Sequence, residues 1–64
     1  MQPHQERVLI EKAELDDKCL KLNSFINGET YKTLNSIEQS LLTKQLAAMT
    51  AYSEILEERI TTFK

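Results

Sequence analysis

Hydrophobic positions in the second half of the chain, from Leu41 to Phe63, recur at alternating spacings of four and three residues. This spacing lays side chains in a stripe along one side of a helix. One stripe, here named the inner line, comprises Leu42, Leu46, Met49, Ser53, Leu56, Ile60 and Phe63. A second stripe one residue earlier, here named the outer line, comprises Leu41, Gln45, Ala48, Tyr52, Ile55 and Arg59. A lone surface helix needs only one apolar stripe, so we expect the inner line to pack within the subunit. The outer line then remains for a subunit interface or for a pocket between subunits.

The first half of the chain carries one stripe with the same period. Its members are Val8, Lys12, Leu15, Cys19, Leu22 and Ile26. Pro3 suits the first turn of a helix, where the N–H group that proline lacks would have no intrahelical partner. Asn27-Gly28 is expected to end the helix, because glycine adopts the left-handed conformation at a C-cap without steric cost. The pattern predicts a helix over about residues 3–27.

The segment between the two patterns, residues 28–35, is short and mostly polar and is predicted to be a loop at the tip of a hairpin. Its two larger side chains, Tyr31 and Leu34, can fold back on the end of the first helix. There they would meet Phe25 and Ile26 and close the tip with a small satellite core.

The second helix is predicted over about residues 36–62. Asn35 and Ser36 are both candidates for its N-cap, since each is followed three residues later by Glu or Gln as in a capping box. Two long helices joined by a short connection form an antiparallel α-hairpin. The sequence therefore predicts an all-α, single-domain hairpin over residues 1–64.

A chain of 64 residues rarely buries enough apolar surface to be stable alone. Cys19 is the only cysteine, so no disulfide can form within the chain, and one cysteine with one histidine does not suffice for a structural zinc site. We therefore expect the hairpin to assemble into a helical-bundle homo-oligomer. Cys19 itself lies on the apolar stripe between Leu15 and Leu22 and is interpreted as a small buried hydrophobe.

Charge and hydropathy exclude several classes of partner. The formal net charge is −2, and acids and bases are interleaved, so no basic field is present to bind duplex nucleic acid. No apolar run approaches the roughly 18 residues of a membrane span, and the N-terminus does not resemble a signal peptide. These features favour a cytoplasmic protein without a membrane partner.

Enzymatic motifs are nearly absent. The sequence has no glycine-rich phosphate loop, no HExxH and no nucleophile elbow. The adjacent acids Asp16-Asp17 and Glu57-Glu58 point about 100° apart on a helix and are interpreted as solvated faces. We therefore expect a protein that is not an enzyme and that uses no cofactor and no metal.

The polar members of the outer line are the strongest candidates for ligand binding. Gln45, Tyr52 and Arg59 are seven residues apart, so they follow one another along one face of the helix. An aromatic ring can stack on a base, a guanidinium can bind phosphate, and an amide can read a base edge. The alternative interpretation is an oligomer interface with a few polar groups at its rim.

Further cationic candidates lie on the first helix. Lys12, in the middle of the apolar stripe, either extends its ammonium group to solvent or binds a phosphate. Arg7 and His4 lie near the open end of the hairpin, close to the end of the second helix that carries Arg59. They add positive charge there.

Three segments carry a resemblance to known proteins and together cover nearly the whole chain. They are the start ERV-x-x-EK-x-ELD-x-K, a first helix ending in Phe-Ile, and a second helix of pattern QLxxMxxYSxxLxxRIxxF. On this pattern the chain resembles a group of small proteins encoded by phages and prophages. In size and hairpin build this group is similar to the phage sponges that defeat CBASS and Thoeris immunity. Those sponges assemble hairpins into oligomers and bind cyclic dinucleotides or cyclic ADP-ribose isomers.

The resemblance implies an anti-defence sponge that sequesters a cyclic nucleotide signal in the host cytoplasm without catalysis. Tyr52 would stack on a base, and Arg59, with Lys12 or Arg7, would hold phosphates. Two other functions stay open at this point. The outer line could dock on a host protein and inhibit it, as helix-in-groove inhibitors do, or the chain could be a small structural oligomer of a phage.

Overall fold

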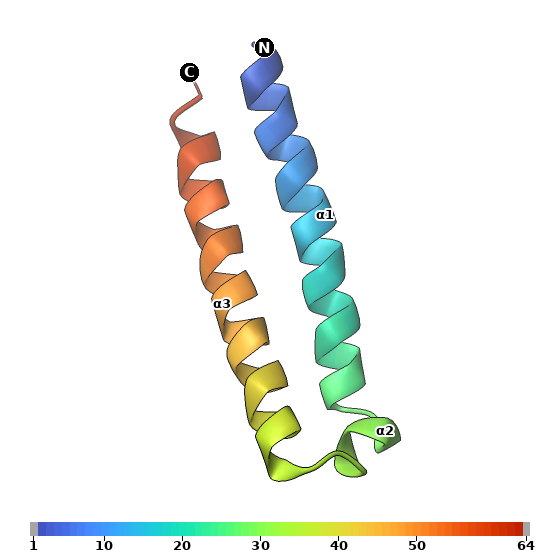
Figure 1. Ribbon diagram of the computed structural model, residues 1–64. Helices are drawn as coiled ribbons and strands as arrows, with labels where there is room; N and C mark the ends of the chain where they lie inside the picture. The colour runs from blue at the N-terminus through green and yellow to red at the C-terminus, as the bar shows by residue number, and fades with distance from the viewer. Residues whose placement is uncertain (1, 64) are drawn as a thin grey trace.

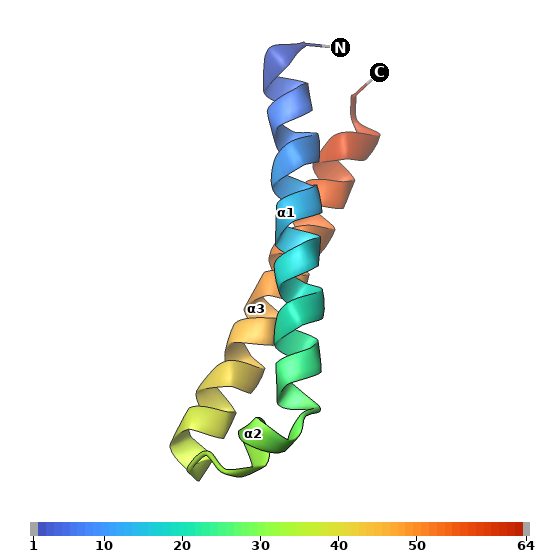
Figure 2. The same cartoon turned by 90° about the vertical axis from the view of Figure 1, so that its right-hand side faces the viewer.

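The computed structural model describes residues 2–63, which form a hairpin of helices 46 Å long and 14 × 13 Å across. Within this range the helices are α1 (Pro3–Ile26), α2 (Glu29–Lys32) and α3 (Ser36–Thr61). α1 and α3 run antiparallel along the whole length, and α2 closes the tip (Figure 1). Seen from the side, the two long helices cross at a shallow angle, and both chain ends lie at the end opposite α2 (Figure 2). The predicted all-α class is confirmed, since the described residues contain no strand.

The start of α1 agrees with the prediction, whereas its end differs. Pro3 occupies the first helical position, and the N–H of Gln2 donates to Oε1 of Gln5 at 3.0 Å. At the other end, Gly28 has a φ of −96° and is not left-handed, so the predicted glycine cap is wrong. The physical reason is that Gly28 already serves as the extended N-cap of the next helix. Asn27 ends α1 instead, and its Nδ2 donates to the Asn23 carbonyl at 2.9 Å.

The tip contains a one-turn helix, α2, where a loop was predicted. It packs against the end of α1, and two hydrogen bonds tie it to α3. The Tyr31 hydroxyl donates to the Gln39 carbonyl at 3.2 Å, and the Gln39 side chain donates back to the Tyr31 carbonyl at 2.9 Å. Hydrophobic periodicity does not predict this reciprocal pair. Leu34 and Phe25 do lie together, as members of one apolar groove at the tip.

The structure decides between the two candidate caps of α3. Oδ1 of Asn35 accepts a hydrogen bond from the Glu38 N–H at 2.8 Å, and Asn35 has the extended backbone of an N-cap residue. Ser36 is the first helical residue. An N-cap acceptor of this kind satisfies one of the backbone donors that the first turn leaves without a partner.

The buried core is small and lies in the half of the hairpin nearer the chain ends. Val8, Leu15 and Leu56 are buried, and Leu56 has no exposed surface. The partly buried side chains that pack against them are Cys19, Met49, Ile60 and Phe63. All belong to the two stripes expected to pack within the subunit. In the tip half, the corresponding side chains are only partly buried, namely Leu22, Ile26, Leu42 and Leu46.

Candidate functional site: the outer line of α3

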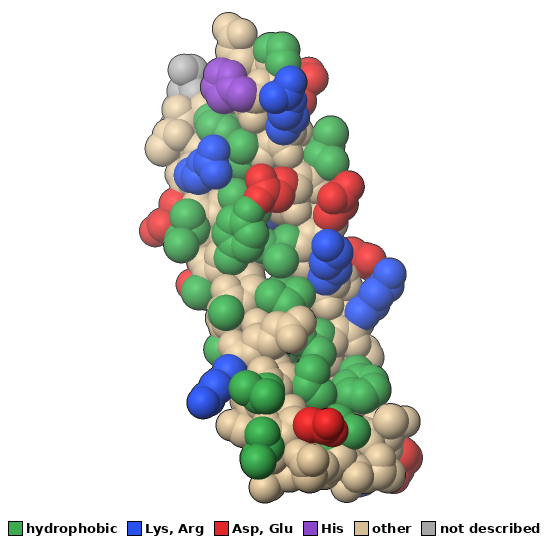
Figure 3. All heavy atoms as spheres, in the orientation of Figure 1, with side chains coloured by type: hydrophobic (Ala, Val, Ile, Leu, Met, Phe, Trp, Pro, Cys, Tyr) green, Lys and Arg blue, Asp and Glu red, His purple; other side chains and the backbone are tan. Residues whose placement is uncertain are grey.

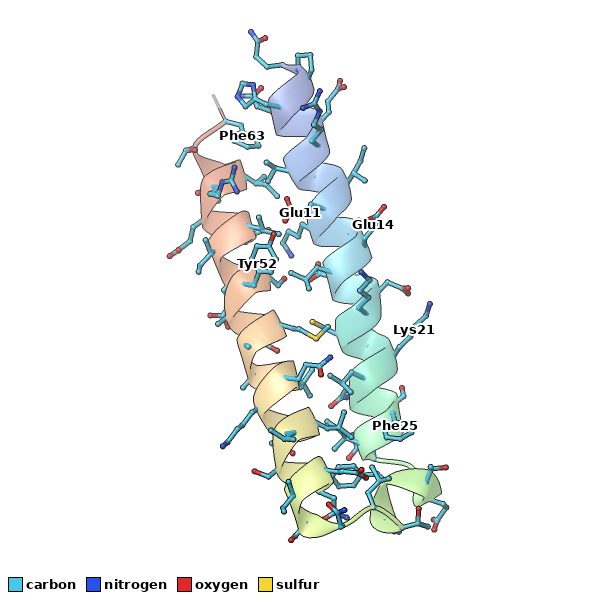
Figure 4. All side chains as sticks on the ribbon, viewed as in Figure 1. Glu11, Glu14, Lys21, Phe25, Tyr52 and Phe63 are labelled. Atoms are coloured by element: carbon cyan, nitrogen blue, oxygen red, sulfur yellow. The ribbon has the colours of Figure 1, made fainter. Side chains whose placement is uncertain are left out.

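Every residue of the outer line is exposed in the hairpin. The exposed fractions of its large apolar members are 42% for Tyr52, 53% for Ile55 and 59% for Leu41. Green apolar side chains accordingly extend along the face of the hairpin that Figure 3 shows. Tyr52 of α3 and Glu11 of α1 lie on this same face (Figure 4). α1 therefore covers the inner line and leaves the outer line open.

Two side chains of the outer line have the chemistry of a nucleotide site. Tyr52 offers a half-exposed ring, and Arg59 follows one heptad later, about 10 Å along the helix axis. Arg59 makes no ion pair with any residue in the range 2–63, so its guanidinium is available to an external anion. Gln45 is one heptad from Tyr52 in the other direction, and its Nε2 makes only a long contact of 3.8 Å with the Met49 sulfur. The three side chains thus line a strip on one chain and do not enclose a pocket.

Three side chains predicted to bind an anion lie at the open end of the hairpin. His4 and Arg7 are exposed in the first two turns of α1, and Arg59 is exposed in the last turn of α3. Basic side chains, and the histidine, lie at this end of the molecule in Figure 3. Neither His4 nor Arg7 forms an ion pair within residues 2–63. The same end also carries four acids, namely Glu6, Glu54, Glu57 and Glu58. An anionic ligand there would therefore depend on direct contact with the guanidinium groups of Arg59 and Arg7, and not on a positive field.

Lys12 does not join this group. Its Nζ donates to Oδ2 of Asp16 at 2.7 Å and to Oγ of Ser53 on α3 at 3.2 Å. It also lies 3.8 Å from Oε2 of Glu57. The Ser53 hydroxyl in turn donates to the other Asp16 oxygen. Lys12 is thus the centre of a polar cluster between the helices, with two carboxylates around its ammonium group. A phosphate at this point would meet those two negative charges.

The cluster corrects the prediction that Asp16 and Glu57 are only solvated surface acids. The hydrogen bond from Lys12, followed by that from Ser53, lowers the pKa of Asp16. The same hydrogen bond to Asp16 raises the pKa of Lys12, against a smaller opposing effect of desolvation. A sequence signal for this cluster existed. Lys12 and Ser53 are the polar members of two otherwise apolar stripes that were predicted to face each other.

Two open grooves flank the interface between the helices. One, of about 410 Å³, combines apolar and polar side chains: Asp16, Cys19, Leu20, Asn23, Leu46 and Thr50. The other, of about 330 Å³, lies at the tip and is lined almost entirely by apolar atoms of Phe25, Leu34, Glu38, Leu41 and Leu42. Leu41 lines the tip groove and is also a member of the outer line, so the tip groove continues into the outer line. Cys19 was predicted to be buried and is only partly so: it packs against the core, with one side on the first groove.

The region 2–63 contains no group of three or more His, Cys, Asp or Glu side chains that could hold a metal ion. Likewise, no helix within it is both long enough and apolar enough to cross a membrane. His4 and Cys19 are fifteen residues apart on α1, which corresponds to about 22 Å along the axis. The thiol therefore has no histidine of its own chain beside it to act as a base.

The chain as a whole matches a known family of proteins. The family model named Sequestin matches residues 2–62, so the chain belongs to the Sequestin family. It is also 39% identical, over 67 residues and the full length of both chains, to a protein of Enterobacteria phage T4. That relative is described as an uncharacterized 7.5 kDa protein in the denB-rIIB intergenic region. No solved structure matches the chain. The predicted membership of a small phage protein family is confirmed, and the family name indicates a sequestering protein.

Proposed function

We propose that this Sequestin-family chain is a non-catalytic phage sponge. It assembles into a homo-oligomer in the host cytoplasm and binds a cyclic nucleotide immune signal, either a cyclic oligonucleotide or a cyclic ADP-ribose isomer. The observation that carries the proposal is the open outer line of α3. There an aromatic ring lies one heptad from a guanidinium that has no ion pair within residues 2–63, on a surface that these residues leave exposed.

Each side chain of the site has a role that follows from its chemistry. Tyr52 stacks on a base, and Arg59 donates two parallel hydrogen bonds to a phosphate. Gln45 reads a base edge. Arg7 adds a second guanidinium near the phosphate end, and His4 adds an imidazole that can donate a hydrogen bond. Lys12 is not assigned to the phosphate in this proposal, because Asp16 and Glu57 already surround its ammonium group, and its role is to hold the helices in register.

Two further findings support sequestration over other activities. The family name refers to sequestering, and the T4 relative shows that proteins of this kind are encoded by a phage. A sponge needs an exposed binding surface and no catalytic group. The outer line offers the former, and its ring, amide and guanidinium bind nucleotides without reacting with them.

A thermal-shift screen tests the proposal. The purified protein is mixed with cyclic dinucleotides, cyclic trinucleotides and cyclic ADP-ribose isomers, each in separate samples. A ligand present at a thousand times its Kd stabilises the folded state by about 4 kcal/mol, which is a large shift for a domain of this size. The bound nucleotide should be recovered chemically unchanged after heat denaturation. A panel without any stabilising nucleotide, or recovery of a cleaved one, contradicts the proposal.

A second candidate is a protein-interaction inhibitor, which the exposed apolar side chains on α3 favour. Ile37, Leu41 and Ile55 are 70%, 59% and 53% exposed, and Leu41 also borders the tip groove. Such a face can dock on a host protein in the manner of a helix in a groove. The two functions give different results with Ile37→Ser, which lies outside the line of Tyr52 and Arg59. An inhibitor would lose its anti-defence effect, whereas a sponge would keep both this effect and nucleotide binding.

A further inference from the structure

The hairpin exposes more surface than a compact protein of its mass. Its accessible surface is 4894 Å², whereas a folded monomer of 7.4 kDa is expected to expose about 4200 Å². The excess of about 700 Å² is close to the roughly 800 Å² that one partner contributes to a stable protein–protein interface. With only three buried apolar side chains in the described chain, this surface must be covered for the fold to be stable. A covering partner required for folding itself is most simply a second copy of the chain.

The direction from which that copy approaches follows from the geometry of α3. Residues one position apart on a helix differ by about 100°, so the outer line lies at nearly a right angle to the inner line that packs on α1. A second α3 placed against the outer line therefore completes a square of four helices. In this square α1 of one copy also lies beside α1 of the other, and antiparallel neighbours of this kind form a four-helix bundle.

We propose that two copies pair through the outer lines of α3, antiparallel, about a two-fold axis between Ala48 and Tyr52. The inference rests on the assembly in the proposed function and not on its ligand. In this register, Ala48 of each copy faces the Tyr52 ring of the other, so that a small side chain receives a large one. Gln45 faces Ile55, and Leu41 faces Arg59.

Charge complementarity selects this register. Lys44 and Glu58 are both exposed, and each lies at the edge of the outer line on the side away from α1. The proposed register brings Lys44 of each copy beside Glu58 of the other, twice per dimer. A shift by one heptad leaves Glu58 beside Ile37 or Ala51, and a parallel pairing sets the two Arg59 side chains against each other. Only the proposed register both matches opposite charges and avoids like ones.

The same register also matches charges on α1. Lys12 lies level with Ser53 and Glu57, which relates positions on α1 to positions on α3. On this alignment of α1 with α3, the two-fold axis passes α1 midway between Glu14 and Lys21. Glu14 of one copy is therefore about level with Lys21 of the other. Both side chains point away from α3 (Figure 4). In this pairing Tyr52 and Gln45 lie in the seam between the two copies, and Arg59 of one copy lies beside Leu41 of the other. The nucleotide of the proposed function would therefore bind within this seam, between the subunits.

Charge reversal tests the register. Sedimentation equilibrium should give a dimer of twice 7.4 kDa for the wild type. Lys44→Glu and Glu58→Lys should each raise its dissociation constant by about 3- to 30-fold, because each change affects two pairs. The double variant should restore it to within about twofold. Glu54→Lys, an equal change of charge one turn before Glu58 and about 40° further from the outer line, should have a much smaller effect. A wild-type monomer at micromolar concentration, or a double variant weaker than both single variants, overturns the proposal.

Crosslinking provides an independent test in a Cys19→Ala background. Ala51→Cys lies next to the two-fold axis and should give a covalent dimer with a short bis-maleimide. Thr50→Cys is also exposed and level with the axis, but it lies on the opposite side of α3 from Tyr52, in the groove that Cys19 and Leu20 line, and should not. A larger assembly supports the pairing if this contrast holds, and equal crosslinking at both positions overturns it. Failure of the inference is separable from failure of the sponge function. If the protein binds a nucleotide but Ala51→Cys does not crosslink, only the proposed pairing is refuted. If Ala51→Cys crosslinks but no nucleotide in the panel binds, only the proposed sponge function is refuted.

Discussion

Lys12 of α1 reaches across the hairpin to Ser53 of α3, with 3.2 Å between Nζ and Oγ. Both residues lie on stripes that are otherwise apolar. With Asp16 and Glu57, they form a polar cluster that can be satisfied only when the two helices are in the observed register. A shift by one turn would separate these groups, so the cluster specifies the alignment of the hairpin, as polar groups do at helix interfaces.

The cluster predicts a specific dependence of stability on acid. The pKa of Asp16 lies below its ordinary value of 3.8 in the folded protein. Its contribution to stability is therefore fully present above about pH 4 and is lost as the pH falls through the lowered pKa. Thermal unfolding followed by circular dichroism from pH 6 to pH 2 should show a steeper loss for the wild type than for Asp16→Asn. Parallel curves for the two proteins would show that the cluster does not bind the carboxylate in its charged form.

The small core makes one side chain unusually important. Leu56 has no exposed surface, so Leu56→Ala should lower the free energy of unfolding by about 2 to 5 kcal/mol through lost burial and a residual cavity. Leu20→Ala removes the same atoms from a side chain that is 68% exposed and should change it by less than about 0.5 kcal/mol. Urea denaturation measures both. Equal effects would mean that the hairpin does not pack α3 against α1 as described.

The N-cap of α3 gives a smaller but sharper prediction. Asn35→Ala removes the acceptor for the Glu38 N–H and should destabilise the protein by about 1 kcal/mol. Ser36→Ala, one residue later, should change stability by no more than a few tenths of that amount, since alanine is a favourable residue within a helix. The same urea experiment compares them. A larger loss for Ser36→Ala would assign the cap to the other register.

The long helices were predictable because their stripes have the helical period over many turns, as with Leu42 to Phe63. The tip was not. Whether Gly28 ends one helix in the left-handed conformation or begins another in an extended one depends on the contact of Tyr31 with Gln39, eight residues away. Sequence periodicity contains no information on such a contact.

The candidate site shows a similar division. Tyr52 and Arg59 were identified from heptad spacing, and they lie on one exposed line because the helix is regular. The placement of Lys12 depended on where its long side chain would turn. Its ammonium group is held by Asp16 one turn later and by Ser53 on the facing helix. Its position could therefore be predicted only once the pairing of the two helices was known.

Titration calorimetry with the cyclic nucleotide that gives the largest thermal shift in the screen tests whether the outer line binds a cyclic nucleotide. Arg59→Met keeps the length of the side chain and removes its charge, and Tyr52→Leu keeps apolar contact and removes the ring. Each should raise the Kd about 5- to 100-fold, which corresponds to a charge-assisted hydrogen bond or one stacked base. Lys32→Ala, which removes a cation at the tip, is the control and should leave the Kd unchanged.

Sedimentation of the same samples separates binding from assembly. Arg59→Met and Tyr52→Leu should remain folded and oligomeric while nucleotide affinity falls. Loss of assembly in both variants would instead assign the two residues to a subunit interface alone. Unchanged affinity in Arg59→Met, with the wild type binding normally, would contradict the account.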